Sequence, residues 1–103
     1  MTKREKIEED LLQHLEESGT HGSHFKDLVD TYLKFWDTVQ QLTAEIEERG
    51  VVVEYKNGEN QYGVKKNDAV AERNKTVNQM LKILNEIGVK PSKKEGDGLP
   101  PKL

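Results

Sequence analysis

The chain has 103 residues, of which 33% are hydrophobic and 34% charged, and its formal net charge is −3 at pH 7. This length fits one domain with a thin core, and the absence of cysteine excludes disulfides and thiolate chemistry and fits a reducing cytosol. The first residues are too charged for a signal peptide, and no apolar run approaches the about 18 residues of a membrane span, so we expect a soluble, cytoplasmic protein.

A short amphipathic helix is predicted from a cap at Thr2 to about Glu17. Its apolar side chains recur at helical spacing and form a narrow strip: Ile7, Leu11, Leu12 and Leu15. So narrow a strip is typical of a helix that covers a core without being part of it. The two glycines of the linker 18–23 then end the helix.

The longest helix is predicted from His24 to Arg49, with Ser23 as its N-cap and Gly50 after its last turn. Its apolar stripe covers about half of the circumference, whereas burial of one helix face needs a band only somewhat wider than about 100°. The surplus indicates a second contact, which we assign to another copy of the chain. We therefore expect a homo-oligomer larger than a dimer, with these interface residues: Phe25, Tyr32, Phe35, Trp36 and Val39.

A β-hairpin is predicted from about Val51 to Lys66, because the helical period gives way there to β-prone residues. Asn57-Gly58 between two such runs is a strong hairpin signal, since both residues tolerate a positive φ. Two strands alone are only marginally stable. The hairpin must therefore lie on the helices or pair with a neighbouring copy.

The last predicted helix begins after a cap at Asn67 and ends near Gly88, and it again carries a broad apolar stripe. We expect it to pack antiparallel on the central helix. The predicted fold class is thus mainly α, with three helices, the two long ones antiparallel and joined by the hairpin, in one helical domain over residues 1–92. Residues 93–103 are rich in Gly, Pro and charged residues, and we expect them to form a disordered tail.

Basic residues gather in the second half of the chain. Residues 1–54 carry 6 basic and 13 acidic groups, whereas residues 55–103 carry 10 and 6, an asymmetry that suggests a polyanionic partner. One basic group lies at the hairpin exit and the start of the last helix, and another follows that helix: Lys65, Lys66, Arg73 and Lys75, then Lys90, Lys93 and Lys94. The first group suits phosphate oxygens, and its other interpretation is an ordinary solvated surface. The second group is either a flexible basic arm or a plain solubilising tail.

No set of catalytic or metal-binding residues stands out. His14, His21 and His24 lack a carboxylate or cysteine at ligand spacing, and we interpret them as histidines of a turn and of helix surfaces. The acidic side chains fall on the wet faces of the helices, and there is no Gly-rich phosphate loop and no Ser-His-Asp arrangement. We therefore expect no enzyme, no metal and no cofactor.

Four segments follow one another in a specific order: a short amphipathic helix, a long helix containing DLVDTYLKFWDTVQQLTAEIEERG, a β-prone connection ending in VKKNDAV, and a helix ending in NQMLKILNEIGVKPSKK. This pattern resembles the short small-terminase-subunit family of tailed double-stranded DNA bacteriophages, over about residues 7–94. Its most specific parts are Tyr32–Trp36, Glu48–Gly50 and Leu81–Ser92, the last similar to the family's Leu-Gly-Leu-Thr-Pro-Ser helix exit. This sequence reads Ile-Gly-Val-Lys-Pro-Ser at 87–92, which departs from that exit in side chains but not in turn chemistry. Two further positions depart from the family: Asp68 replaces a frequent Pro, and Lys93 a frequent Arg.

The resemblance implies a non-catalytic DNA-packaging factor, a ring-like oligomer that recognises the packaging site on double-stranded DNA and recruits a large terminase subunit with ATPase and nuclease activities. It implies action in the cytoplasm of the bacterial host, with no membrane contact and no place in the mature virion. Four tail residues are then candidates for binding the large subunit, because two leucines flank a stiff Pro-Pro segment: Leu99, Pro100, Pro101 and Leu103. The other interpretation is an inert solubilising tail.

Two other functions are compatible with the same residues. One is a helical protein-interaction adaptor whose basic residues only improve solubility. The other is a small regulator in which the first two helices form a DNA-reading helix-turn-helix, although Asp27, Asp30 and Asp37 on the second helix would then face phosphate.

Overall fold

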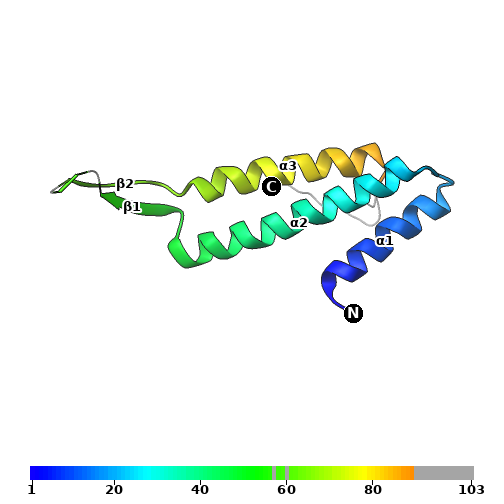
Figure 1. Ribbon diagram of the computed structural model, residues 1–103, viewed down its shortest axis with the longest axis horizontal. Helices are drawn as coiled ribbons and strands as arrows, with labels where there is room; N and C mark the ends of the chain where they lie inside the picture. The colour runs from blue at the N-terminus through cyan, green and yellow to red at the C-terminus, as the bar shows by residue number, and fades with distance from the viewer. Residues whose placement is uncertain (57, 60, 90–103) are drawn as a thin grey trace, which may run out of the picture.

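The computed structural model describes residues 1–56, 58–59 and 61–89. The chain forms, in order, α1 (Lys3–Glu17), α2 (Ser23–Arg49), β1 (Val52–Lys56), β2 (Tyr62–Lys66) and α3 (Asp68–Glu86). The predicted fold class is confirmed: there are three helices, and the long α2 and α3 lie antiparallel with the hairpin between them (Figure 1). Within the described part of the chain, no helix is both long enough and apolar enough to cross a membrane.

Helix α1 begins at the predicted cap. The Thr2 hydroxyl accepts a hydrogen bond from the Glu5 backbone N–H at 3.1 Å, and the Glu5 carboxylate accepts one from the Thr2 N–H at 2.8 Å, which completes a capping box. The helix packs on the first half of α2 (Figure 1) and buries Leu11 and Leu15. The prediction that α1 only covers the core is therefore wrong, because these two leucines are part of it.

The start of α2 also differs from the prediction. Ser23 is already helical, and the N-cap is Gly22, which makes no side-chain cap. Gly22 has a φ of +123°, a conformation that residues with a Cβ avoid, and a Cβ there would lie 2.9 Å from Cε1 of His24. A glycine backbone turn therefore starts this helix in place of a serine cap.

The boundaries on either side of the hairpin are as predicted. Gly50 ends α2 with a φ of +87°, and its N–H donates to the Ile46 carbonyl oxygen at 2.7 Å. Asn67 caps α3, because its Oδ1 accepts from the Ala69 N–H at 3.0 Å. Both ends follow from local chemistry that the sequence displays.

The best-buried hydrophobic residues lie where the three helices meet, at the end away from the hairpin. Val29 and Leu33 of α2 form one cluster with Leu11 and Leu15 of α1 and with Ile87, which follows α3. Leu33 is only 1% exposed. Half-buried hydrophobic residues surround this cluster: Ile7, Phe25, Leu28, Tyr32, Leu84 and Val89.

The hairpin pairs β1 with β2 antiparallel, with Val52 opposite Lys66. Tyr55 lies across from Gly63, and its ring and hydroxyl occupy the space that a Cβ at position 63 would need. The hairpin projects beyond the ends of α2 and α3 instead of lying along them (Figure 1). The hairpin was expected either to pack on the helices of its own chain or to pair with a neighbouring copy. Most of the hairpin does not pack on its own helices.

Candidate nucleic-acid interface

The predicted basic group at the hairpin exit is spread over opposite faces. Lys65 and Lys66 are the last residues of β2, and successive strand residues point to opposite faces of a sheet. Lys65 Nζ lies 3.7 Å from Asp68 Oδ2, and both side chains are more than half exposed, so solvent weakens this pair. The two lysines therefore present positive charge on both sides of the hairpin.

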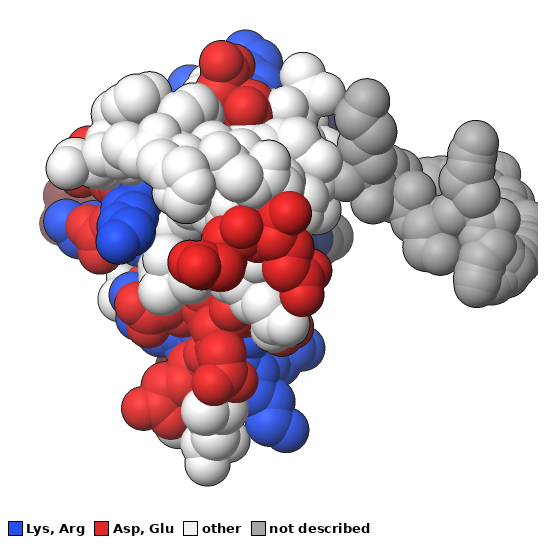
Figure 2. All heavy atoms as spheres, turned by 90° about the vertical axis from the view of Figure 1, so that its right-hand side faces the viewer, with Lys and Arg blue, Asp and Glu red and all other residues white. Residues whose placement is uncertain are grey.

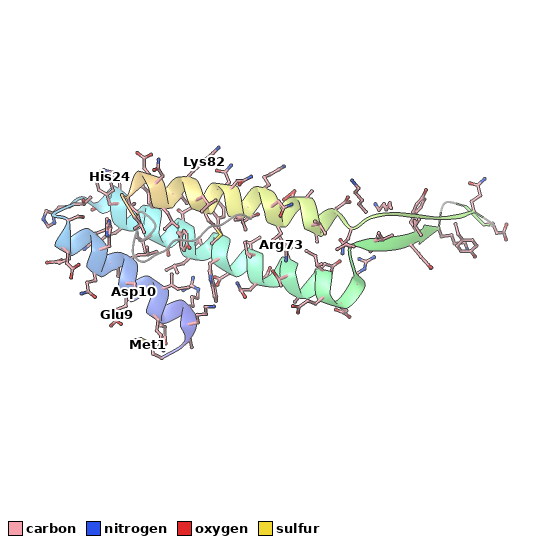
Figure 3. All side chains as sticks on the ribbon, turned by 180° about the vertical axis from the view of Figure 1, so that it is seen from behind. Met1, Glu9, Asp10, His24, Arg73 and Lys82 are labelled. Carbon is pink, nitrogen blue, oxygen red and sulfur yellow. The ribbon has the colours of Figure 1, made fainter. Side chains whose placement is uncertain are left out.

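Arg73 and Lys75 also point apart, because two residues on a helix lie about 200° from each other. Arg73 is half-buried, and its Nη1 donates to Thr43 Oγ1 of α2 at 3.4 Å. Figure 3 shows it between the two long helices. Lys75 is exposed. The structure thus does not bring the four predicted basic residues onto one face of a single chain.

Lys82, which was not among the predicted site residues, shares a face with Lys75. It follows Lys75 by about two helical turns, both side chains are exposed, and Figure 3 shows Lys82 pointing away from α2. The signal was present in the sequence as an i, i+7 spacing within a predicted helix. Nearness in sequence groups Lys75 with Arg73, whereas the helical period places Lys75 on the face of Lys82.

Acidic side chains lie mainly on other surfaces. Helix α1 carries six of them, including Glu9 and Asp10 on its outer side (Figure 3). Figure 2, which looks at the end where α1 turns into α2, shows acidic side chains gathered over the region of α1. Between Arg73 and Asn85, by contrast, the sequence contains no Asp or Glu. The middle of α3 is therefore the described helix surface that best suits a polyanion.

The predicted interface residues of α2 are partly used within the chain. Phe25 and Tyr32 pack against the core cluster, and burial raises the pKa of the Tyr32 hydroxyl. Phe35, Trp36 and Val39 are half-buried. The most exposed large apolar side chains lie elsewhere, on the hairpin, on α3 and at the N-terminus: Met1, Val51, Val52, Tyr55, Tyr62, Val64 and Leu81.

The three histidines do not converge. His14 Nε2 lies 3.1 Å from the Ile87 carbonyl oxygen and ties α1 to the end of α3. His24 packs on Phe25 with ring centroids 4.2 Å apart, and His21 is exposed in the turn before α2. Among the described residues, no group of three or more His, Cys, Asp or Glu could hold a metal ion.

The other predicted site residues lie outside the described residues, as does the whole tail 93–103. They comprise the second basic group and the candidate large-subunit contact: Lys90, Lys93, Lys94, Leu99, Pro100, Pro101 and Leu103.

Comparison with known families gives a match that covers most of the chain. The family described as "Phage terminase, small subunit" matches residues 8–97. No similar curated protein and no similar solved structure was found.

Proposed function

This chain belongs to the phage terminase small-subunit family, and we propose that it is a non-catalytic packaging factor that recognises the packaging site on double-stranded DNA and recruits the large terminase subunit. The family match over residues 8–97 is the observation that carries this proposal. The factor would act in the cytoplasm of the bacterial host while the genome is packaged, and would not remain in the mature virion.

The proposed DNA contact uses the outer side of α3 together with the hairpin exit. Lys75 and Lys82 face solvent on α3, and Lys65 and Lys66 are exposed where β2 leads into that helix. Each phosphate that such groups neutralise releases counterions and strengthens binding at low salt. Arg73 would join them only by leaving Thr43, and the 3.4 Å separation of that pair indicates a weak hydrogen bond. Lys90, Lys93 and Lys94 would extend the contact beyond α3.

Self-association would cover the apolar surface that one chain leaves open. Val52, Tyr62 and Val64 share one face of the hairpin and are 52%, 73% and 66% exposed, and an isolated two-stranded sheet is marginal in water. The half-buried Phe35, Trp36 and Val39 offer a second patch. A head-to-tail contact repeated around an axis closes into a ring, and a ring would hold many weak DNA contacts together.

The tail is the proposed contact for the large subunit. It follows the last helix, and Leu99 and Leu103 flank its Pro100-Pro101 pair. A stiff, extended segment loses less entropy on docking than a flexible one, which would favour capture of a partner by these four residues.

A helix-turn-helix regulator fits the arrangement of the helices less well. Its recognition helix would be α2, which packs against both α1 and α3. That helix also carries acidic residues, and Asp37 holds Arg4 of α1 in an ion pair at 2.8 Å. A protein-interaction adaptor predicts no salt-dependent affinity for DNA, so it is distinguished by a binding measurement.

An in vitro packaging reaction tests the proposal. The reaction contains procapsids, the large subunit of the same phage, ATP and phage DNA, and it measures DNA that has become protected from nuclease. We expect protection to require this chain, while ATP hydrolysis by the large subunit alone persists without it. Equal protection with and without the chain would contradict a packaging role, and ATP hydrolysis by the purified chain would contradict a non-catalytic one.

A further inference from the structure

The exposed side of α3 carries a regular pattern of amides and lysines. Five side chains fall within a band about 100° wide, on the side of the helix opposite the buried Met80 and Ile83, and all five are exposed: Asn74, Lys75, Asn78, Lys82 and Asn85. We call these five residues the amide–lysine stripe. From its first to its last residue the stripe extends about 16 Å along the helix axis.

The fold does not account for the stripe. Within the described residues, its side chains form no hydrogen bond or ion pair with other protein side chains. Asparagine is one of the weaker helix formers, because its side chain competes with the helical backbone for hydrogen bonds. Three asparagines on one exposed helix face are therefore not explained by the stability of α3.

The two residue types occupy different sides of the stripe. At about 100° per residue, Lys75 and Lys82 lie along one border, and the three asparagines lie along the other. Glu72 precedes the stripe and Glu86 follows it, so the surface between them is free of carboxylates. A ligand that matches the stripe offers negative charge along one side and hydrogen-bonding groups beside it.

The major groove of duplex DNA offers that combination. It is about 12 Å wide and admits an α-helix, its rim carries phosphates, and its floor presents base edges. Lysine binds the phosphates, while asparagine makes a bidentate pair of hydrogen bonds with N6 and N7 of adenine. We infer that α3 lies in the major groove, with Lys75 and Lys82 on the backbone and Asn74 and Asn78 reading base edges, adenine in preference.

This inference rests on the proposed function and adds to it the element that selects the sequence. The test is a selection from a pool of randomised duplexes with the full-length chain, followed by measurement of affinity for the enriched duplex and for the unselected pool. In the double variant Asn74→Ala/Asn78→Ala, the preference for the enriched duplex should fall roughly 5- to 150-fold for each asparagine that pairs with a base in the wild-type complex. Affinity for the unselected pool should stay nearly unchanged.

Misfolding is not expected in this variant, because alanine is a better helix former than asparagine at exposed positions. The matched control is Gln40→Ala/Gln41→Ala, which removes two exposed amides from α2 and should leave the preference intact. A second variant, Lys75→Ala/Lys82→Ala, should weaken binding to both DNA samples alike and reduce the salt slope by up to about two units.

Each outcome decides a separate point. Unchanged sequence preference in the asparagine variant overturns the reading role of α3 and leaves the packaging proposal standing. A wild-type chain that binds DNA but enriches no sequence overturns both the reading role of α3 and the recognition of a packaging site. Unchanged affinity in the lysine variant overturns the proposed phosphate contact. A wild-type chain that binds no duplex DNA at all overturns both the inference and the DNA-binding part of the proposed function.

Discussion

The side-chain Nδ2 of Asn67 donates to the carbonyl oxygen of Gly50 at 2.8 Å and so joins the start of α3 to the end of α2. The same side chain caps α3 through Oδ1, and the Asn67 backbone N–H donates to the Val51 carbonyl oxygen at 2.8 Å. Asn67 is only 5% exposed, so water does not readily replace these partners. Asn67 thus closes the base of the hairpin and holds the end of α2 next to the start of α3.

Replacing Asn67 separates its two side-chain roles. Asn67→Ala should lower the free energy of unfolding by about 1–3 kcal/mol, because α3 loses its cap and the Gly50 carbonyl loses a partner. Asn67→Asp keeps a capping oxygen but cannot donate to that carbonyl, so it should recover only part of the loss. Equilibrium urea unfolding measures both, with the exposed Asn85→Ala as the control. An Asn67→Asp variant as stable as the wild type would show that the bond to Gly50 does not contribute.

Arg4 and Asp37 should hold α1 in place through geometry as well as charge. Arg4 Nε donates to Asp37 Oδ1 at 2.8 Å and Nη2 donates to Oδ2 at 3.1 Å, and the hydrogen bond with Asp37 raises the pKa of the guanidinium. Arg4→Lys keeps the charge but loses the two-pronged contact. Both Arg4→Ala and Arg4→Lys should lower the thermal unfolding midpoint more than Lys34→Ala does. That control breaks an exposed pair with Asp30 within α2, and an equal or larger effect of the control would contradict the prediction.

The glycine at the start of α2 should be harder to replace than the one in the preceding turn. Gly22→Ala places a Cβ at a φ of +123° and within 2.9 Å of the His24 ring, and we expect a loss of about 1–3 kcal/mol in unfolding free energy. Gly19 has a φ of +70° with open space around it, so Gly19→Ala should cost less, about 1–2 kcal/mol. Urea unfolding compares the two, and the reverse order would mean that the backbone at Gly22 relaxes easily.

The helix boundaries that were predicted correctly depend on neighbours in sequence. The cap at Thr2, the cap at Asn67 and the exit at Gly50 each act within a few residues. The predicted Ser23 cap is wrong because the helix starts one residue earlier, with Gly22 as its N-cap. The positive φ of Gly22 leaves room for the ring of His24, which packs on Phe25. A local strand pattern does not indicate which surface the strand packs against. The position of the hairpin relative to the helices could therefore not be predicted.

The faces on which the basic residues lie could be predicted only in part, and their contact with DNA stays a prediction. Lys65, Lys66, Arg73 and Lys75 are close together in sequence. Neighbouring residues of a helix or a strand nevertheless point to different faces, so closeness in sequence does not place these side chains on one surface. Arg73 lies on the same face of α3 as Met80, one heptad later, and this periodicity predicts that it turns toward α2. The same periodicity pairs Lys75 with Lys82, so a helical projection of the predicted α3 would have found the exposed basic face.

Self-association should depend on the apolar surface of α2 that remains half open. We expect the wild-type chain to run as an assembly larger than a dimer in size-exclusion chromatography with light scattering. Trp36→Asp should dissociate the assembly, because it places an unpaired charge in an apolar contact. Gln40→Asp, on an exposed position of the same helix, should not. Circular dichroism on the dissociated variant tells loss of assembly from loss of fold, and a wild-type monomer at tens of micromolar would contradict the proposal.

Binding of the wild-type chain to a labelled duplex over a range of salt concentrations tests the central claim most directly. If the chain is a DNA-packaging factor that neutralises phosphates, the logarithm of its affinity should fall linearly with the logarithm of the salt concentration. The slope should be about −0.9 for each phosphate contacted. An affinity that does not change with salt, or no binding even at low salt, would contradict the claim.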